Sequence, residues 1–278
     1  MVLAVYFLSG YKRFESYKKW EEKKDIYFVD NMPAMTTLDA YYWLKIAKDY
    51  DNGKLGKVDI DSLKTYPDGE KFRNTPPMLP WLISFIHKTF DLDYYRAGLF
   101  LIPFLAGLFC IPLFFYMQRL GYGESAVIGG LLGSFSYSYY VRSMMGRVDT
   151  DLLNIFFPIL VSFFILLMKK DNSLKKNLVL SILAGLSMFM FIWWYEKTGF
   201  ILVYLLCILV YLFIQKVENK NIALIAVTFC IASNPVYTFG SLGQLIDFFN
   251  AYFFPKPAGQ IFWPDIMKTI IESKKRGF

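Results

Sequence analysis

The stretch AGLFLIPFLAGLFCIPLFFYMQ (97–118) indicates the fold class, because it contains no charged residue over its whole length. A membrane-spanning helix needs about 20 predominantly apolar residues. Further charge-free stretches follow along the chain, at 125–141, 152–168, 177–195, 198–215 and 221–246. We therefore expect an all-α, polytopic membrane helix bundle with about six spanning helices.

The composition supports this class and excludes others. Of 278 residues, 55% are hydrophobic and 19% charged, which excludes a disordered chain, a collagen-like chain and a disulfide scaffold. The net charge is +7, but the cations lie at the ends of apolar stretches, which is typical of membrane topology and not of a nucleic-acid partner. Cys110, Cys207 and Cys230 lie inside apolar stretches and are interpreted as small buried hydrophobes. His87 is the only histidine and is interpreted as a polar residue on a surface helix, so the chain has almost no material for histidine-based metal sites or Ser-His-Asp triads.

The charges between the apolar stretches predict the orientation in the membrane. The first, third and fifth linkers together hold seven Lys and Arg residues, including Lys169, Lys170, Lys175 and Lys176, whereas the second and fourth hold three. Alternate linkers share a side, and the more basic side is cytoplasmic. The linker with Asp149 and Asp151, the end of 177–195 and everything after 246 are then expected to face the periplasm or the extracytoplasmic space.

The same pattern predicts four regions. Residues 1–10 are expected to be the remnant of a first transmembrane helix, and residues 11–93 a long first extracytoplasmic loop with surface helices at 38–50 and 79–90. Residues 94–246 form the transmembrane bundle, and 247–278 an outward loop. Within the last apolar stretch, Asn234-Pro235 should break a helix, so this stretch is one span or holds a re-entrant or additional pair.

Carboxylates next to the membrane are the informative residues, because a charge near hydrocarbon is costly unless it is paired or bound to a metal. Asp149-Thr-Asp151 follows the second apolar stretch, and two carboxylates on a non-helical backbone can reach one hard divalent cation. Asp151 could equally cap the next helix. Asp39 could complete a capping box with Thr36, and Glu272 could be a solvated glutamate. All of them are nevertheless expected on the outward side.

The motifs carried by these residues resemble one family. Asp39-Ala-Tyr-Tyr, Gly146-Arg-Val-Asp-Thr-Asp151, Trp193-Trp-Tyr195 and Thr269-Ile-Ile-Glu272 occur in this order. Together they look like the catalytic subunit of oligosaccharyltransferase in its single-subunit bacterial or archaeal form, in the N-terminal transmembrane part. The resemblance implies the multi-spanning (GT-C type) glycosyltransferase fold. It also implies inverting transfer of a glycan from a polyprenyl phosphate or diphosphate carrier to the asparagine amide of Asn-x-Ser/Thr in an acceptor polypeptide.

The resemblance also implies roles for particular residues. Asp39, Asp149 and Glu272 would be ligands of one Mn²⁺ or Mg²⁺, and Asp39 and Glu272 would also hydrogen-bond the acceptor amide. Asp151 and Arg142 would complete the catalytic site, with Arg142 orienting the carboxylates. Tyr195, with the neighbouring Trp194, would contact the carrier-linked sugar.

Two departures from the family leave more than one function open. The family's soluble C-terminal domain is expected to be absent, and one apolar stretch lies between 198–215 and the Thr-Ile-x-Glu motif where bacterial relatives have three. The chain would then be a fragment, or an inactive remnant. A different membrane glycosyltransferase that uses polyprenyl-phosphate sugars also remains open. A transporter or channel is disfavoured because the apolar stretches contain no charge.

Overall fold

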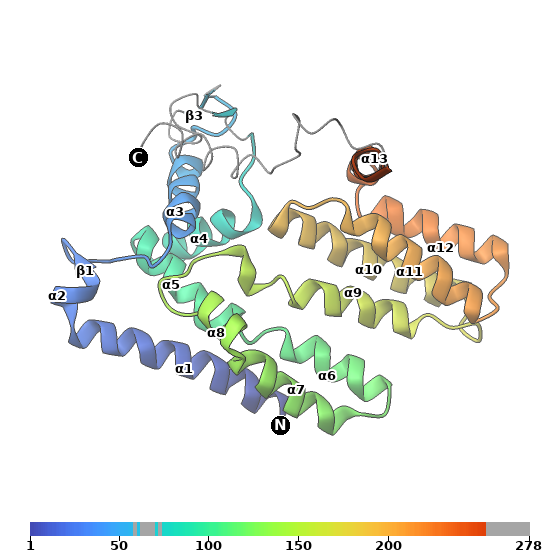
Figure 1. Ribbon diagram of the computed structural model, residues 1–278, viewed down its shortest axis with the longest axis horizontal. Helices are drawn as coiled ribbons and strands as arrows, with labels where there is room; N and C mark the ends of the chain where they lie inside the picture. The colour runs from blue at the N-terminus through green and yellow to red at the C-terminus, as the bar shows by residue number, and fades with distance from the viewer. Residues whose placement is uncertain (58–59, 62–69, 72–73, 254–278) are drawn as a thin grey trace.

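The structure, a computed structural model, describes residues 1–57, 60–61, 70–71 and 74–253. Helices make up most of this part of the chain, and its strands form two short antiparallel hairpins (Figure 1). The expected all-α class is therefore confirmed. Glu272 and the rest of the Thr-Ile-x-Glu motif lie outside the described residues.

The first helix is longer than the sequence indicated. Helix α1 runs continuously over Val2–Glu22 and packs along α5, α6 and α7. Its charged second half is helical because Glu15 pairs with Lys12 at 2.8 Å and with Lys19 at 3.5 Å, the one-turn spacing that stabilises a helix. The boundary expected at residue 10 is thus corrected: residues 11–22 continue the helix and do not begin a loop.

The first loop follows α1 and contains the expected surface helices. It comprises α2 (Lys24–Tyr27), β1 (Phe28–Val29), β2 (Met32–Pro33), α3 (Leu38–Asp51), β3 (Ile60–Asp61), β4 (Glu70–Lys71) and α4 (Met78–Phe90). The helices expected at 38–50 and 79–90 are confirmed within one residue. Strand β1 pairs with β2 and β3 with β4. In Figure 1, α3 stands across the direction of the long helices and carries the first candidate carboxylate, Asp39, in its first turn.

The remaining helices form the apolar bundle. They are α5 (Tyr94–Leu105), α6 (Cys110–Arg119), α7 (Gly123–Phe135), α8 (Tyr137–Arg142), the 3₁₀ turn η1 (Thr150–Leu152), α9 (Phe156–Leu167), α10 (Leu174–Tyr195), α11 (Phe200–Ile214), α12 (Asn219–Ala232) and α13 (Pro235–Phe253). The boundary expected between residues 246 and 247 falls inside α13 and is also corrected.

Fewer helices than expected are long enough to cross a membrane. Among the described residues, Tyr94–Arg119, Thr150–Leu167 and Leu174–Tyr195 meet the length and hydropathy required, and a bent pair would make a fourth. By this criterion the described residues contain three or four candidate spans, where the sequence predicts about six. The stretch 125–141 is divided at Ser136, whose extended backbone separates α7 from α8, and α11 has only 15 residues.

The bent pair confirms the expected helix break. Asn234 has a φ of 81° between α12 and α13, and Asn234 Oδ1 accepts a hydrogen bond from the Val236 amide at 2.9 Å. Pro235 follows directly, and the axes of the two helices differ by 98°. Asparagine tolerates the left-handed conformation better than most residues, so the sequence Asn-Pro places the bend here.

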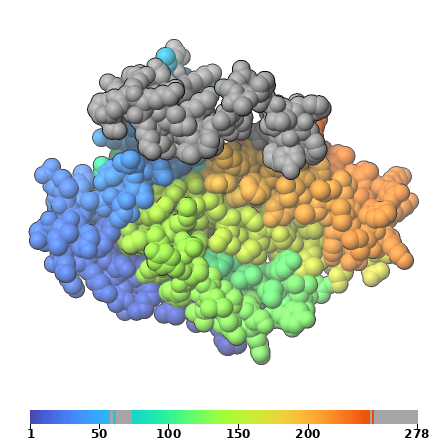
Figure 2. Space-filling view, viewed as in Figure 1, coloured from blue at the N-terminus to red at the C-terminus, as the bar shows by residue number. Residues whose placement is uncertain are grey.

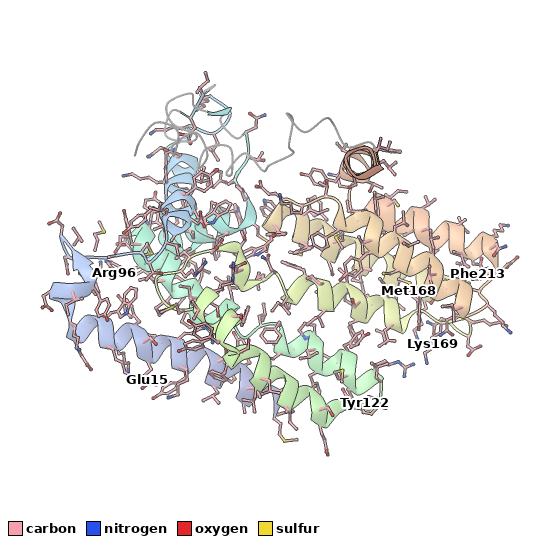
Figure 3. The ribbon with its side chains drawn as sticks, viewed as in Figure 1. Glu15, Arg96, Tyr122, Met168, Lys169 and Phe213 are labelled. Atoms are coloured by element: carbon pink, nitrogen blue, oxygen red, sulfur yellow. The ribbon has the colours of Figure 1, made fainter. Side chains whose placement is uncertain are left out.

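The first, third and fifth linkers lie at one end of the bundle, as the charge pattern predicts. Figure 3 shows Tyr122, Lys169 and Phe213, which lie at or beside these linkers, at the same end of the molecule, and Arg96 and Glu15 toward the other. Between them, α10 packs closely on α9 and α12. The Ser181 hydroxyl donates to Ile225 O at 2.7 Å, and Phe191, Trp194 and Phe229 fill the core.

Candidate active site

Asp39 lies at the exposed start of α3. The side chain of Thr37 caps this helix by accepting a hydrogen bond from the Ala40 amide at 3.4 Å. The capping residue is therefore Thr37, and the predicted capping box of Thr36 with Asp39 is corrected. The N-terminal end of α3 carries the positive end of the helix dipole, which favours a negatively charged carboxylate in the first turn.

Asp149 and Asp151 lie on the turn between α8 and α9 and have different partners. Asp149 has an extended backbone, and its Oδ1 accepts a hydrogen bond from the Thr150 amide at 2.6 Å. Asp151 Oδ2 accepts from Arg142 Nη1 at 2.8 Å, and its Oδ1 accepts from Asn154 Nδ2 at 3.3 Å. Arg142 therefore contacts one of the carboxylates that it was predicted to orient.

A backbone contact joins the first loop to this turn. The Thr36 amide donates to Gly146 O at 3.0 Å, although 110 positions separate the two residues in the sequence. Gly146 has a φ of 82°, and a Cβ there would lie 2.5 Å from the Trp20 ring and 2.8 Å from the Thr36 methyl group. Only glycine allows this approach. Figure 2 shows the same neighbourhood, with the blue first-loop residues directly against the yellow-green residues of the turn.

The electrostatic environment of Asp149 indicates that Asp39 and Asp149 belong to one site. Burial is the largest cause that raises the pKa of the Asp149 carboxyl, and the negative charges of Asp151 and Asp39 raise it further. The Thr150 amide, which hydrogen-bonds the carboxylate, and the nearby Trp43 indole lower this pKa. Trp43 follows Asp39 by one helical turn on α3, so the same helix presents both side chains to Asp149.

This pKa predicts how Asp149 affects stability. An acid whose pKa is raised in the folded chain favours the folded state while it is protonated, and that contribution is lost as pH rises through the folded pKa. In cation-free buffer, Asp149→Asn should therefore raise the melting temperature. The difference from the parent should increase from about pH 4 to about pH 7. A difference that stays constant with pH, or shrinks, in thermal unfolding scans would contradict a costly ionisation at this position.

Trp194 is a buried support of the turn. It is 0% exposed, and its indole N–H donates to Thr150 O at 2.6 Å. The prediction that Trp194 contacts the sugar is corrected, because a side chain without exposed surface cannot meet a substrate. Tyr195 is half-buried, stacks on Phe191 with ring centroids 5.8 Å apart, and lies close enough to Arg142 to interact with its charge.

Trp194→Phe should weaken the turn while preserving most of the packing. The phenyl ring fills much of the same space, but Thr150 O keeps only a weak bond from the Leu153 amide at 3.4 Å. We expect a loss of about 1–2 kcal/mol in the free energy of unfolding. The control is Trp193→Phe, which removes a bond to Pro76 O at 2.9 Å from a half-buried side chain and should cost less. Denaturant titration measures both, and equal losses would contradict the role of Trp194.

The metal prediction is not tested by these residues. In the described part of the chain, no group of three His, Cys, Asp or Glu side chains could hold a metal ion. The third predicted ligand, Glu272, lies outside that part. The donors that are described, Asp39 and Asp149, are carboxylate oxygens, the ligand type that Mg²⁺ and Mn²⁺ prefer.

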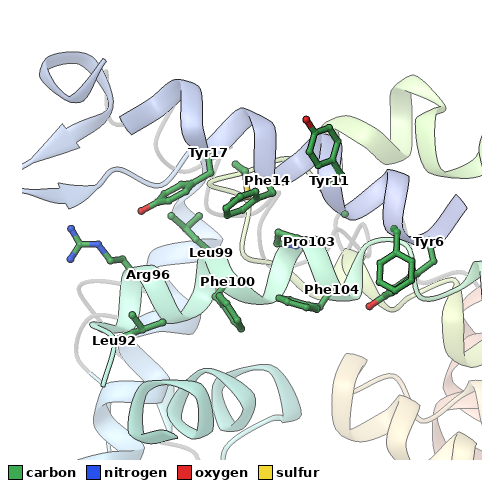
Figure 4. A pocket seen from close by; sticks show the side chains of 13 residues that line it. Tyr6, Tyr11, Phe14, Tyr17, Leu92, Arg96, Leu99, Phe100, Pro103 and Phe104 are labelled. Atoms are coloured by element: carbon green, nitrogen blue, oxygen red, sulfur yellow. The ribbon is translucent and has the colours of Figure 1, made fainter. Parts of the chain in front are cut away.

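An apolar cavity elsewhere has a different chemical character. It has a volume of about 610 Å³, lies between α1 and α5, and contains none of the predicted site residues. In Figure 4, Phe14, Phe100 and Phe104 line it, with Arg96 at one end and Tyr6 at the other. Its polar groups are the hydroxyls of Tyr6, Tyr11 and Tyr17 and the guanidinium of Arg96, which is paired with Asp93 at 2.6 Å, and no carboxylate is among its lining residues. The carboxylates of α3 and of the α8–α9 turn are therefore the candidate active site.

Comparison with a family model gives an independent match. The model described as "Oligosaccharyl transferase STT3, N-terminal" matches residues 17–254. This range contains Asp39, Arg142, Asp149, Asp151, Trp194 and Tyr195.

Two curated relatives are similar in sequence. The undecaprenyl-diphosphooligosaccharide–protein glycotransferase of Campylobacter jejuni is 25% identical over 198 residues, which cover 71% of this chain and 25% of the relative. The dolichyl-phosphooligosaccharide-protein glycotransferase of Methanococcus voltae is 29% identical over 200 residues, covering 63% and 22%. The chain thus spans about a quarter of the length of these relatives.

Solved structures share the fold. The apo oligosaccharyltransferase of Archaeoglobus fulgidus superimposes with a TM-score of 0.63 at 16% identity, over 84% of this chain and 28% of that one. The archaeal oligosaccharyltransferase AglB from the same organism, in complex with an inhibitory peptide and a dolichol-phosphate, gives a TM-score of 0.60 at 18% identity. That match covers 74% of this chain and 26% of AglB.

Proposed function

This chain belongs to the oligosaccharyl transferase STT3 family, and from that membership we propose that it transfers a glycan from a polyprenyl carrier to protein. The carrier is a polyprenyl phosphate or diphosphate, and the acceptor is the side-chain amide of asparagine in Asn-x-Ser/Thr. The names of the two relatives support this reaction class. One solved neighbour is tethered to an acceptor peptide containing an NVT sequon, which supports the acceptor type.

One observation carries the proposal for this chain. Asp39 on α3 and Asp149 on the α8–α9 turn lie close enough for the charge of one to raise the pKa of the other. Their neighbours Thr36 and Gly146 hydrogen-bond through the backbone. Segments that are distant in the sequence thus present carboxylates to a common space.

The reaction needs such carboxylates because an amide nitrogen is a poor nucleophile. Its lone pair is delocalised into the carbonyl group, and carboxylates that accept both N–H bonds would rotate the nitrogen out of conjugation. We assign this role to Asp39 and Glu272. The nitrogen then attacks the sugar carbon from the face opposite the carrier phosphate, and the bond between that carbon and the phosphate oxygen breaks, which inverts the configuration at the carbon. One amide proton passes to a carboxylate, and the carrier leaves as the phosphate or diphosphate.

The carboxylate oxygens of this site are the kind of donor that a divalent cation, Mn²⁺ or Mg²⁺, prefers. Burial, and after it two neighbouring carboxylates, make the ionisation of Asp149 costly, and a nearby positive charge would offset this cost. Asp39, Asp149 and Glu272 would hold the ion. When bound, it would stabilise the negative charge on the leaving phosphate.

The remaining site residues act around these carboxylates. Arg142 holds Asp151 through the 2.8 Å ion pair and keeps the turn in position. Tyr195 lies near Arg142 on the end of α10, where we expect it to contact the carrier-linked sugar. The positive-inside pattern supports a multi-pass location in the cell membrane, with this end of the bundle facing the periplasm or extracytoplasmic space.

The direct test is transfer by the full chain in proteoliposomes. The donor is a polyprenyl-linked oligosaccharide, and the acceptors are a fluorescent peptide with an Asn-x-Thr sequence and its Gln-x-Thr counterpart. We expect a glycopeptide of increased mass from the first peptide only. Transfer to lipid or to a free glycan instead would favour a different membrane glycosyltransferase, as would full activity of Glu272→Gln.

A further inference from the structure

Arg13 is a charged side chain buried inside the bundle. It lies on α1 and is 0% exposed. Its partners among the described residues are all neutral: Nε donates to Ser143 O at 2.8 Å, Nη1 to Ser9 O at 3.0 Å and Ser9 Oγ at 2.7 Å, and Nη2 to Ser134 O at 3.2 Å and Ser143 Oγ at 2.6 Å. A guanidinium has five N–H bonds, so every donor is used.

The five acceptors come from three separate elements. Ser9 is on α1 itself, Ser134 is near the end of α7, and Ser143 directly follows Arg142 at the end of α8. Figure 1 shows α7 lying along α1, and α8 follows α7 and packs on it. The contact to Ser143 is double, through the carbonyl oxygen and the hydroxyl group. Arg13 therefore fixes the residue next to the arginine that pairs with Asp151.

Tyr139, also in contact with Arg13, holds the other end of the same segment. The Arg13 guanidinium lies 5.9 Å from the Tyr139 ring centroid and 5.0 Å from that of Tyr140. The Tyr139 hydroxyl lies 2.7 Å from Ala106 O and 3.0 Å from Leu152 O, so these carbonyls share its proton. The segment between Ser143 and Leu152, which carries Gly146, Asp149 and Asp151, is thus anchored at both ends.

We propose that Arg13 is a positioning residue that acts through Ser143 and Tyr139 to hold Arg142 and the two aspartates in the geometry used for transfer. This inference rests on the proposed function. A buried charge with neutral partners contributes little to the stability of the fold, because its desolvation is costly and apolar side chains of similar volume stabilise a core at least as well. What a guanidinium adds is five directed hydrogen bonds. A lysine offers three and would leave at least two acceptors without this partner.

A matched pair of serine variants tests the proposal without removing the charge. Ser143→Ala and Ser9→Ala each delete one hydroxyl acceptor of Arg13, at 2.6 and 2.7 Å, but only Ser143 belongs to the segment that carries the site. For Ser143→Ala we expect kcat to fall about tenfold with unchanged KM for peptide, the factor that corresponds to one hydrogen bond to a charged group. Ser9→Ala should stay within about twofold of the parent. Equal losses in both variants, or none in either, would overturn the proposal.

A second measurement separates positioning from stability. Arg13→Lys should lower kcat about tenfold or more in the parent. In an Arg142→Ala background it should lower kcat by less than about threefold, because the ion pair between Arg142 and Asp151 that Arg13 positions is already lost. Losses that multiply would show that Arg13 acts independently of Arg142. The melting temperature of each variant is recorded, so that a variant that fails to fold is replaced by the serine pair.

Hydrogen exchange provides a readout that does not depend on transfer. Amide exchange at residues 144–149 should become faster in Ser143→Ala and remain at the parent rate in Ser9→Ala. If the parent transfers no glycan, the proposed function fails, yet the exchange data still decide whether Arg13 and Ser143 hold the segment. Unchanged exchange in Ser143→Ala would overturn the inference even with an active enzyme.

Discussion

Asp149→Ala will lower glycan transfer by at least about 100-fold, because it removes a charge that the site places next to the reacting groups. Besides burial, the neighbouring side chains of Asp151, Asp39 and Trp43 all affect the pKa of Asp149. Most of the loss should appear in kcat and not in KM for peptide, since the proposed contacts act on the reacting atoms. The assay is initial-rate glycopeptide formation in proteoliposomes.

The matched control is another aspartate at the opposite end of the bundle. Asp171 lies exposed in the linker between α9 and α10, and Asp171→Ala should retain the parental rate. Removal of divalent cations with EDTA should abolish transfer, and Mn²⁺ or Mg²⁺ should restore it. Transfer that persists in Asp149→Ala would refute the role of this carboxylate, and transfer that persists in EDTA would refute the cation.

Gly146→Ala will disrupt the contact between the first loop and the α8–α9 turn. The new methyl group would overlap the Trp20 ring and the Thr36 side chain, and the φ of 82° disfavours any side chain. We expect a loss of about 3 kcal/mol or more in the free energy of unfolding, from backbone strain together with overpacking. Transfer should fall with it, since Asp39 and Asp149 approach each other across this contact.

Gly121→Ala is the control that isolates the packing contribution. Gly121 has a similar φ of 89°, but a Cβ there meets nothing within 4 Å. This variant should lose only the backbone contribution, about 1–2 kcal/mol, and should transfer glycan normally. If denaturant titrations gave the same loss for both variants, the close approach at Gly146 would make no contribution to the free energy of unfolding.

The sequence predicted what depends on local chemistry and periodic charge. Charge-free stretches indicated the helical class, and Asn234-Pro235 indicated the break between α12 and α13. The alternation of basic linkers indicated which loops share an end of the bundle. The order of the acidic motifs indicated the family. Each of these signals can be read from the sequence alone, without knowledge of the tertiary contacts.

The sequence did not reveal features that depend on tertiary contacts. The stretch after residue 10 is highly charged and was interpreted as a loop, yet Arg13 within it is buried because serines from α7 and α8 satisfy its donors. The motif resemblance predicted that Trp194 contacts the carrier-linked sugar, whereas its buried indole supports Thr150. Gly146 was quoted in its motif without a role, since its crowding comes from Trp20 and Thr36. Only the spacing of Asp39 and Trp43, one turn apart on α3, was available in advance.

The proposed function requires that Asp39 and Asp149 act in one site, and a double-mutant cycle on glycan transfer measures whether they do. Single-turnover rates are measured for Asp39→Ala, Asp149→Ala and the double variant, in the full chain with a polyprenyl-linked donor and an Asn-x-Thr peptide. Residues that act as a unit give grossly non-additive losses. We predict that the double variant is no slower than the slower single variant, within about threefold. Losses that multiply, or a parental rate in Asp39→Ala, would contradict a shared site.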